Sequence, residues 1–232
     1  MELLLKNRFY PITSCIGFLE TDMDTATAAF LQWQEGLLPK DNTDFHLKKQ
    51  AEQGSLENLL PLLLPLLSRE LRKHLFVATK SNWIAYFNNK KSGTDAASVI
   101  GYLPTQINCR GLIVKAILND PAKKRPGAIV FDMYGPQTVN YKNNIRTISL
   151  LNDSSKWEFF QQGEPFNFEE TDEYNAPAMQ DRFTFSMLTK YLSALGLHPF
   201  DENFYMPAAV LIEKEGPLYP GMQTFMLEDV NK

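Results

Sequence analysis

The side chains best suited to chemistry are few and widely spaced. The 232 residues include three histidines, His46, His74 and His198, and two cysteines, Cys15 and Cys109. A nucleophilic mechanism needs a serine or cysteine beside a histidine base, and a metal site needs ligands at short spacing. The sequence shows neither pattern, and it has no glycine-rich phosphate loop. We therefore expect no catalytic residue, no metal and no cofactor.

Carboxylates are concentrated between Glu158 and Asp181. Five carboxylates and three aromatic rings fall between Glu164 and Tyr174. A pair of carboxylates with different pKa values can cleave a glycosidic bond, whereas an acidic surface with aromatic rings suits binding to a basic protein. A solvated loop without a partner is the third interpretation, and the sequence leaves all three open. The candidate partner-binding residues are Glu164, Glu169, Glu170, Asp172, Glu173 and Tyr174.

Lysine and arginine are absent from Gly163 to Gln180. These carboxylates therefore lack a local cation. We expect them to face solvent, a partner or a basic patch elsewhere in the fold, and we expect their replacement by lysine to leave folding nearly intact.

A second polar and aromatic cluster lies between Trp83 and Asp95. In a strand, Tyr86 and Asn88 point to the same face, and Asp95 follows at the turn into a helix. These three residues are candidates for the rim of a ligand-binding site. The alternative is structural, because a packed strand, an asparagine turn and an aspartate helix cap account for the same residues.

Composition limits the classes of partner and the compartment. The net charge is −4, whereas nonspecific nucleic-acid binding requires basic clusters, so we expect no nucleic-acid partner. Residues 59–67 form the richest apolar run, which is far shorter than the roughly 20 residues of a membrane span. Two cysteines allow at most one disulfide and are typical of free thiols in a reducing compartment. We expect a cytoplasmic protein without a membrane partner.

The hydrophobic pattern predicts the elements that must position these residues. Strands are expected at residues 9–19, 75–79, 83–87, 112–118, 128–134, 146–151, 157–161 and 208–212. Helices are expected from a capping box at 21–24 to Leu37, over 96–103 with an end at Pro104, and from Thr184 to Gly196. Residues 56–71 are expected to form two short turns or one kinked helix, and residues 39–54 a polar connector.

Strands joined by short turns favour an α+β fold, with a mainly antiparallel sheet and helices packed on it. We expect residues 1–232 to form a single domain. Strands 112–118 and 128–134 should pair antiparallel. Trp33, Trp83 and Trp157 should be largely buried, because each lies on an apolar face.

Several strings resemble a bacterial family of uncharacterised cytoplasmic proteins, over about residues 75–205. They are Trp83-x-Ala-Tyr-Phe-x-Asn with Gly93-Thr-Asp, Cys109-Arg-Gly-Leu, Phe168-Glu-Glu-Thr, and Arg182-Phe-Thr with Met187-Leu-x-x-Tyr-Leu-x-Ala-Leu-Gly. This resemblance assigns no catalytic residue.

In general character, the chain is also similar to immunity proteins of bacterial toxin systems, including those of contact-dependent growth inhibition. That resemblance implies a protein that binds and neutralises a cognate toxin, for example a nuclease domain. The alternative is an enzyme or small-ligand-binding protein that uses the region from Trp83 to Asp95.

Overall fold

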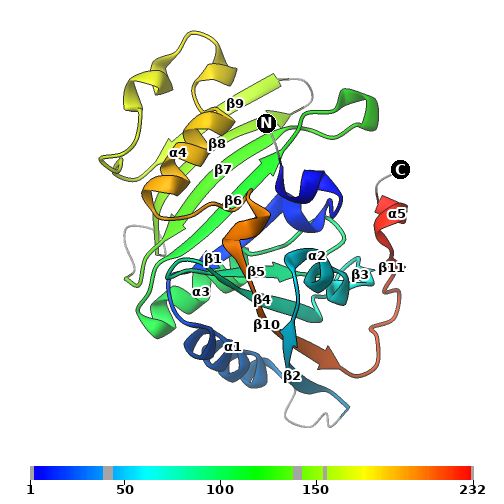
Figure 1. The fold of residues 1–232 in the computed structure, drawn as a ribbon. Helices are drawn as coiled ribbons and strands as arrows, with labels where there is room; N and C mark the ends of the chain where they lie inside the picture. The colour runs from blue at the N-terminus through cyan, green and yellow to red at the C-terminus, as the bar shows by residue number, and fades with distance from the viewer. Residues whose placement is uncertain (1–2, 39–43, 138–142, 154–155, 231–232) are drawn as a thin grey trace.

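A nine-stranded antiparallel sheet runs through the molecule (Figure 1). The computed structural model describes residues 3–38, 44–137, 143–153 and 156–230, and every count of elements refers to those residues. The strands of the sheet are β1 (Cys15–Leu19), β2 (His46–Gln53), β4 (Lys73–Thr79), β5 (Ile84–Asn88), β6 (Gly111–Ile117), β7 (Ala128–Tyr134), β8 (Asn144–Asp153), β9 (Lys156–Gln162) and β10 (Tyr205–Glu215). Their order is β2-β10-β4-β5-β1-β6-β7-β8-β9. The fold is α+β, as the sequence predicts.

Local and distant pairings build the two halves of this sheet. Strands β6 to β9 form a meander, and β6 pairs antiparallel with β7, as expected, with Leu112 opposite Met133. In the other half, β10 pairs with both β2 and β4, although it follows them by more than a hundred residues. A separate pair joins β3 (Leu66–Leu67) to β11 (Thr224–Phe225).

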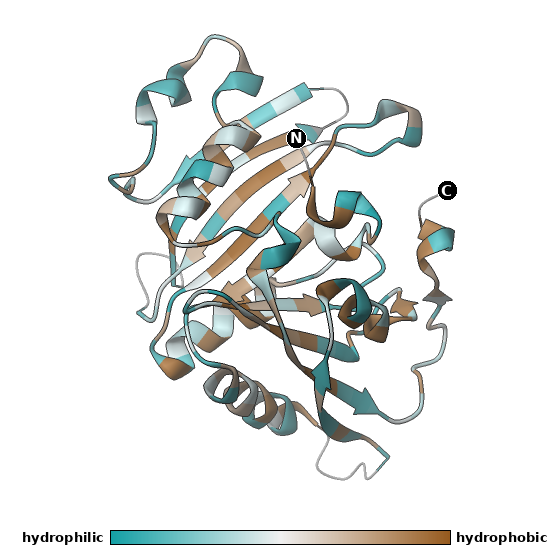
Figure 2. Ribbon diagram, viewed as in Figure 1, coloured by the Kyte–Doolittle hydropathy of each residue, from teal (hydrophilic) through white to brown (hydrophobic). Residues whose placement is uncertain are grey.

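Helices cover both faces of the sheet. On one face, α1 (Met23–Leu37) and α3 (Ala97–Ile107) bury Phe30 and Ile100 against the sheet. On the other, α2 (Leu56–Leu59), α4 (Phe185–Ala194) and the N-terminal turns enclose the larger core, which includes Trp83 and Tyr191. The apolar strands beneath α4 are visible in Figure 2. The short helix α5 (Leu227–Val230) lies near the C-terminus.

Short 3₁₀ turns connect the regular elements. They are η1 (Leu4–Asn7), η2 (Ile12–Ser14), η3 (Leu60–Leu63), η4 (Pro121–Lys123), η5 (Thr171–Asn175), η6 (Met179–Asp181) and η7 (Glu202–Phe204). The first strand is therefore shorter than predicted, because η2 occupies residues 12–14 and the strand begins at Cys15. Pro11 contributes to this outcome, since it has no amide N–H for a strand ladder.

The prediction of a polar connector is wrong over residues 46–53, because these residues form the edge strand β2. Most of its side chains are exposed or half-exposed, so the strand has no alternation of apolar residues to reveal it. Its backbone hydrogen bonds to β10 define it instead. Residues 39–43 of the predicted connector lie outside the described residues.

Two predicted helix boundaries need correction. The N-cap of α1 is Asp22 rather than Thr21, because the Asp22 carboxylate accepts a hydrogen bond from the Thr25 amide at 2.8 Å. Helix α3 continues through Pro104 to Ile107 and ends at Asn108, which has a left-handed backbone. Proline is accommodated in its last turns, and the carbonyl of Pro104 accepts a bond from the Cys109 amide.

The start of α4 and the burial of the tryptophans can be compared with the predictions. Thr184 caps α4, as expected, by accepting a bond from the Met187 amide. Of the predicted span 56–71, residues 56–63 form the consecutive short elements α2 and η3, whereas the chain is extended from Leu64 and forms the strand β3 at residues 66–67. Trp83 is fully buried, whereas Trp33 and Trp157 are half-buried.

No helix among the described residues has the length and apolarity needed to cross a membrane.

Candidate functional site

The acidic segment, residues 163–181, links β9 to the turn before α4. It begins at Gly163, whose φ of +88° lies in the left-handed region. A Cβ atom at this position would lie 2.1 Å from the carbonyl oxygen of Ile145. Only glycine fits this close approach, which directs the chain away from the sheet at the end of β9.

A buried ion pair fastens the acidic segment to the sheet. The side chains of Arg146, on β8, and Glu169 are both 0% exposed. Arg146 Nε donates to Glu169 Oε1 at 2.9 Å, and Nη2 donates to Oε2 at 2.6 Å. The remaining guanidinium donors reach Gln161 Oε1 and the carbonyls of Gln162 and Gly163. The pair is bidentate and fully hydrogen-bonded, which a buried charge pair requires.

Two tyrosines complete this attachment. The Tyr174 hydroxyl donates to Glu169 Oε2 at 2.7 Å and lies 3.1 Å from the Tyr191 hydroxyl. Tyr191 Oη also accepts a bond from the backbone amide of Glu170. Burial, followed by the hydrogen bonds to Tyr191 and Glu169, raises the pKa of Tyr174 far above its ordinary value. Both tyrosines therefore stay neutral and serve to hold the acidic segment on α4.

The candidate partner-binding residues fall into two groups. Glu164, Asp172 and Glu173 are exposed, and Asp181 joins them. Glu170 is about a third exposed and forms an ion pair with the exposed Lys190.

Glu169 and Tyr174 do not belong to the accessible surface, which corrects their assignment as partner-binding residues. Their polar groups are used inside the fold. The cation that holds Glu169 comes from β8, so the absence of local lysine and arginine did not predict exposure. Because Glu169 is buried in an ion pair, we instead expect lysine at this position to disrupt folding.

The ring that is exposed near this edge of the sheet is Phe160 rather than Tyr174, and it lies on the face of the sheet opposite to the one that the acidic segment covers. Phe160, on the edge strand β9, is 52% exposed, and Leu151 on β8 is 42% exposed. Phe160 alternates with Phe159, which packs against the core. The alternation that places Trp157 and Phe159 inside is the sequence signal that identifies Phe160 as outward-facing.

Two of the three residues of the predicted ligand rim are part of the core. Tyr86 and Asn88 are fully buried. Asn88 Nδ2 donates to Tyr86 Oη at 3.1 Å and to the Asp95 carbonyl at 2.8 Å. Tyr86 Oη also lies 2.7 Å from His74 Nδ1. Asp95 is exposed but provides no side-chain cap to α3, so all three residues have structural roles.

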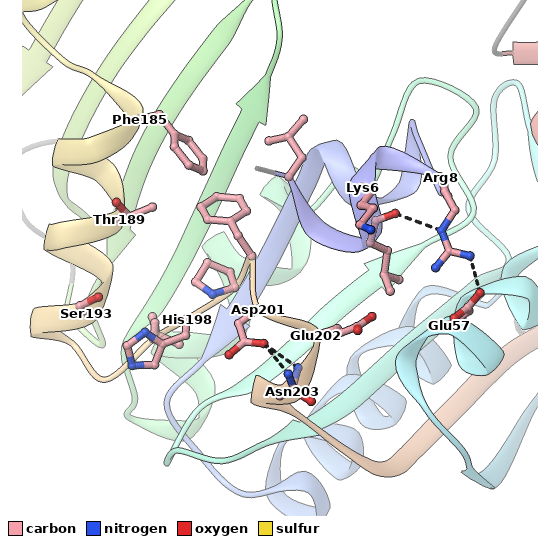
Figure 3. Close-up of a pocket in the computed structure, with 15 residues that line it drawn as sticks. Lys6, Arg8, Glu57, Phe185, Thr189, Ser193, His198, Asp201, Glu202 and Asn203 are labelled. Carbon is pink, nitrogen blue, oxygen red and sulfur yellow. Dashed lines mark hydrogen bonds and ion pairs between the residues drawn. The ribbon is translucent and has the colours of Figure 1, made fainter. Parts of the chain in front are cut away.

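A large pocket was not predicted from the sequence. It has a volume of about 840 Å³ and is formed by three segments that are distant in the chain (Figure 3). Lys6 and Arg8 come from the N-terminal turn, Glu57 from α2, and His198 and Asp201 from the chain after α4. Each residue is ordinary in its local sequence, so no motif marks the set.

Comparison with known proteins assigns no family. No protein-family model matches the chain, and no curated protein or solved structure is significantly similar to it. The resemblances to bacterial cytoplasmic proteins and to immunity proteins therefore stay predictions. The function has to be inferred from the geometry of these surfaces.

Proposed function

We propose that this protein is a non-catalytic, cytoplasmic immunity protein that neutralises a cognate toxin with a basic surface, such as a nuclease domain. One observation carries the proposal: the acidic segment is clamped to the fold, yet it presents four exposed carboxylates that form no ion pair with the described lysines and arginines. These are Glu164, Asp172, Glu173 and Asp181.

The buried ion pair of Arg146 and Glu169 makes this surface suitable for binding. A segment of this length without a long helix or strand would ordinarily lose much conformational entropy when it binds a partner. Arg146 and Glu169 have already fixed its path in the free protein. The exposed carboxylates are therefore held in place before encounter, which favours affinity.

Charge and apolar contact have separate roles in this proposal. Nucleases have basic active sites because their substrates are polyanions, so a fixed acidic surface can occupy such a site. The charges accelerate encounter and select the partner. Phe160 supplies an exposed ring on the edge strand β9, on the face opposite to the acidic segment, so it contributes only to an interface that extends around this edge.

The test is association with the protein encoded by the gene immediately upstream, measured by stopped-flow fluorescence at low and high salt. The neutralised variant is Glu164→Gln, Asp172→Asn, Glu173→Gln and Asp181→Asn. We expect it to associate about tenfold more slowly at low salt, with a smaller difference at high salt because salt screens the field. Phe160→Ser should accelerate dissociation if the interface extends around the edge strand onto the other face of the sheet.

A control variant changes the net charge by the same amount at exposed or half-exposed carboxylates outside the acidic segment: Asp24→Asn, Glu35→Gln, Glu52→Gln and Glu228→Gln. It should associate almost as fast as the parent protein. If the two variants slow association equally, net charge alone matters and the acidic segment is not the interface. Absence of any complex with the upstream-encoded protein would remove the support for an immunity role.

A further inference from the structure

The pocket beside the N-terminal turn has one apolar wall. Phe185, at the start of α4, and Phe200 are half-buried, and their ring centroids lie 4.8 Å apart. Leu5 and the fully buried Leu197 continue this wall. Phe185 points toward the pocket in Figure 3. An apolar side chain of a ligand would find two aromatic rings and aliphatic carbon on this wall.

Opposite charges reach the same pocket from different segments. Lys6 lies on the N-terminal turn, whereas Asp201 and Glu202 lie on the turn after α4 (Figure 3). Arg8 is already paired with Glu57. Within the described part of the chain, Lys6, Asp201 and Glu202 form no ion pair. Asp201 Oδ1 accepts hydrogen bonds from the Asn203 amide and from Asn203 Nδ2, which leaves Oδ2 for a ligand, and Glu202 also interacts electrostatically with Arg8.

The backbone that carries Lys6 is unusual. Leu5, Lys6 and Asn7 have φ values of 50°, 51° and 61°, so three successive residues with side chains are left-handed. A left-handed backbone is strained for residues such as leucine and lysine, and strained backbone of this kind gathers at ligand sites. The turn buries Leu5 and leaves Lys6 exposed at the pocket.

We propose that this pocket binds a short apolar peptide with both ends free. The ammonium group of the peptide lies against Asp201 and Glu202, its carboxylate lies against Lys6, and an aromatic or large aliphatic side chain packs on Phe185 and Phe200. The cavity of about 840 Å³ is in the size range of sites for drug-sized ligands, so it accommodates more than one amino acid. This inference does not depend on the proposed inhibitor function, since the acidic segment lines no part of the pocket.

The two charged ends can be tested separately. Isothermal titration calorimetry with the full chain at pH 7 compares the tripeptide Leu-Phe-Leu with its N-acetylated and C-amidated forms. We expect the free tripeptide to bind with micromolar to millimolar affinity. Each blocked form should have a dissociation constant at least about ten times higher, because each loses one charge-assisted contact.

Variants assign each end to its residue. In Asp201→Asn with Glu202→Gln, acetylation should no longer weaken binding, whereas amidation should still do so. Lys6→Gln should give the reverse pattern. Controls at distant exposed residues, Glu35→Gln and Lys123→Gln, should bind all three forms as the parent protein does.

Three results would overturn the proposal. The first is failure of the free tripeptide to bind at millimolar concentration. The second is equal binding of the free and blocked forms, which would indicate simple partition onto an apolar surface. The third is a blocked form, acetylated or amidated, that binds as tightly as the free tripeptide. This is expected if the pocket binds one terminus of a longer protein, and it contradicts a ligand with both ends free. Association with the upstream-encoded protein is a separate measurement, so either proposal can fail alone.

Discussion

Arg146 shows how a single residue determines the shape of a surface. Its five N–H donors make five hydrogen bonds, two of them to Glu169. Both side chains are excluded from water, so each charge depends on the other. The exposed pair of Glu170 with Lys190, one residue further along the chain, lies in solvent, where an ion pair contributes little.

This contrast gives a prediction for adjacent residues. Glu169→Gln leaves the Arg146 charge buried without its counterion, which should lower the free energy of unfolding by about 3–5 kcal/mol. Glu170→Gln should lower it by less than about 1 kcal/mol. Urea denaturation followed by tryptophan fluorescence measures both. Similar effects for the two variants would mean that Glu169 is not held in the buried pair.

At the scale of elements, the acidic segment depends on the close approach of Gly163 to Ile145, the residue that precedes Arg146 on β8. The carbonyl of Gly163 also accepts a bond from the Arg146 guanidinium. A side chain at this position would meet the Ile145 carbonyl and would adopt a strained backbone. The turn therefore sets both the path of the segment and the position of a buried acceptor.

Two glycine-to-alanine substitutions should change the stability of the protein in opposite directions. Gly163→Ala should destabilise the protein by more than about 1 kcal/mol, because alanine is strained at positive φ and meets backbone atoms. Gly36→Ala, in α1, places its Cβ where no atom lies within 4 Å, so it should stabilise the helix by about 0.5–1 kcal/mol. Thermal unfolding by circular dichroism distinguishes them. Tolerance of alanine at Gly163 would show that the segment leaves β9 by another path.

At the scale of the whole molecule, both faces of the sheet are packed, and this packing buries a titratable side chain, that of His74. His74 on β4 is 5% exposed and lies between Phe30 and Tyr86. Burial lowers the pKa of His74 to about 3. The unfolded chain protonates this histidine below its ordinary pKa of about 6.5, whereas the folded chain keeps it neutral.

The stability of the molecule should therefore fall as the pH is lowered below 6.5. Because the unfolded state binds the extra proton, the free energy of unfolding loses about 1.4 kcal/mol per pH unit, or about 2 kcal/mol by pH 5. His74→Asn should flatten this dependence, whereas Gln32→Asn, at an exposed residue that does not titrate, should not. Chemical denaturation between pH 7 and pH 5 measures the slopes. Equal slopes in all three proteins would show that His74 is accessible to protons in the folded state.

The sequence by itself determined the elements whose signals are local. Apolar residues at helical spacing predict α1, the apolar pattern predicts the strands β6 to β9 and the pairing of β6 with β7, and a threonine cap and a glycine delimit α4. These patterns depend on near neighbours in the chain, so they are readable without the fold. The sequence also showed that the carboxylates gather in one segment, and that Trp157 and Phe159 share the inner face of a strand.

Only the tertiary structure decided which distant groups meet. The polar strand β2 is defined by its pairing with β10, and the partner of Glu169 is Arg146 of β8, 23 residues earlier. The pocket joins an N-terminal turn to the residues that follow α4. The physical reason is the same in each case. Whether a charge is buried, paired or exposed depends on which segments pack together, and local hydrophobic periodicity carries no information about that choice.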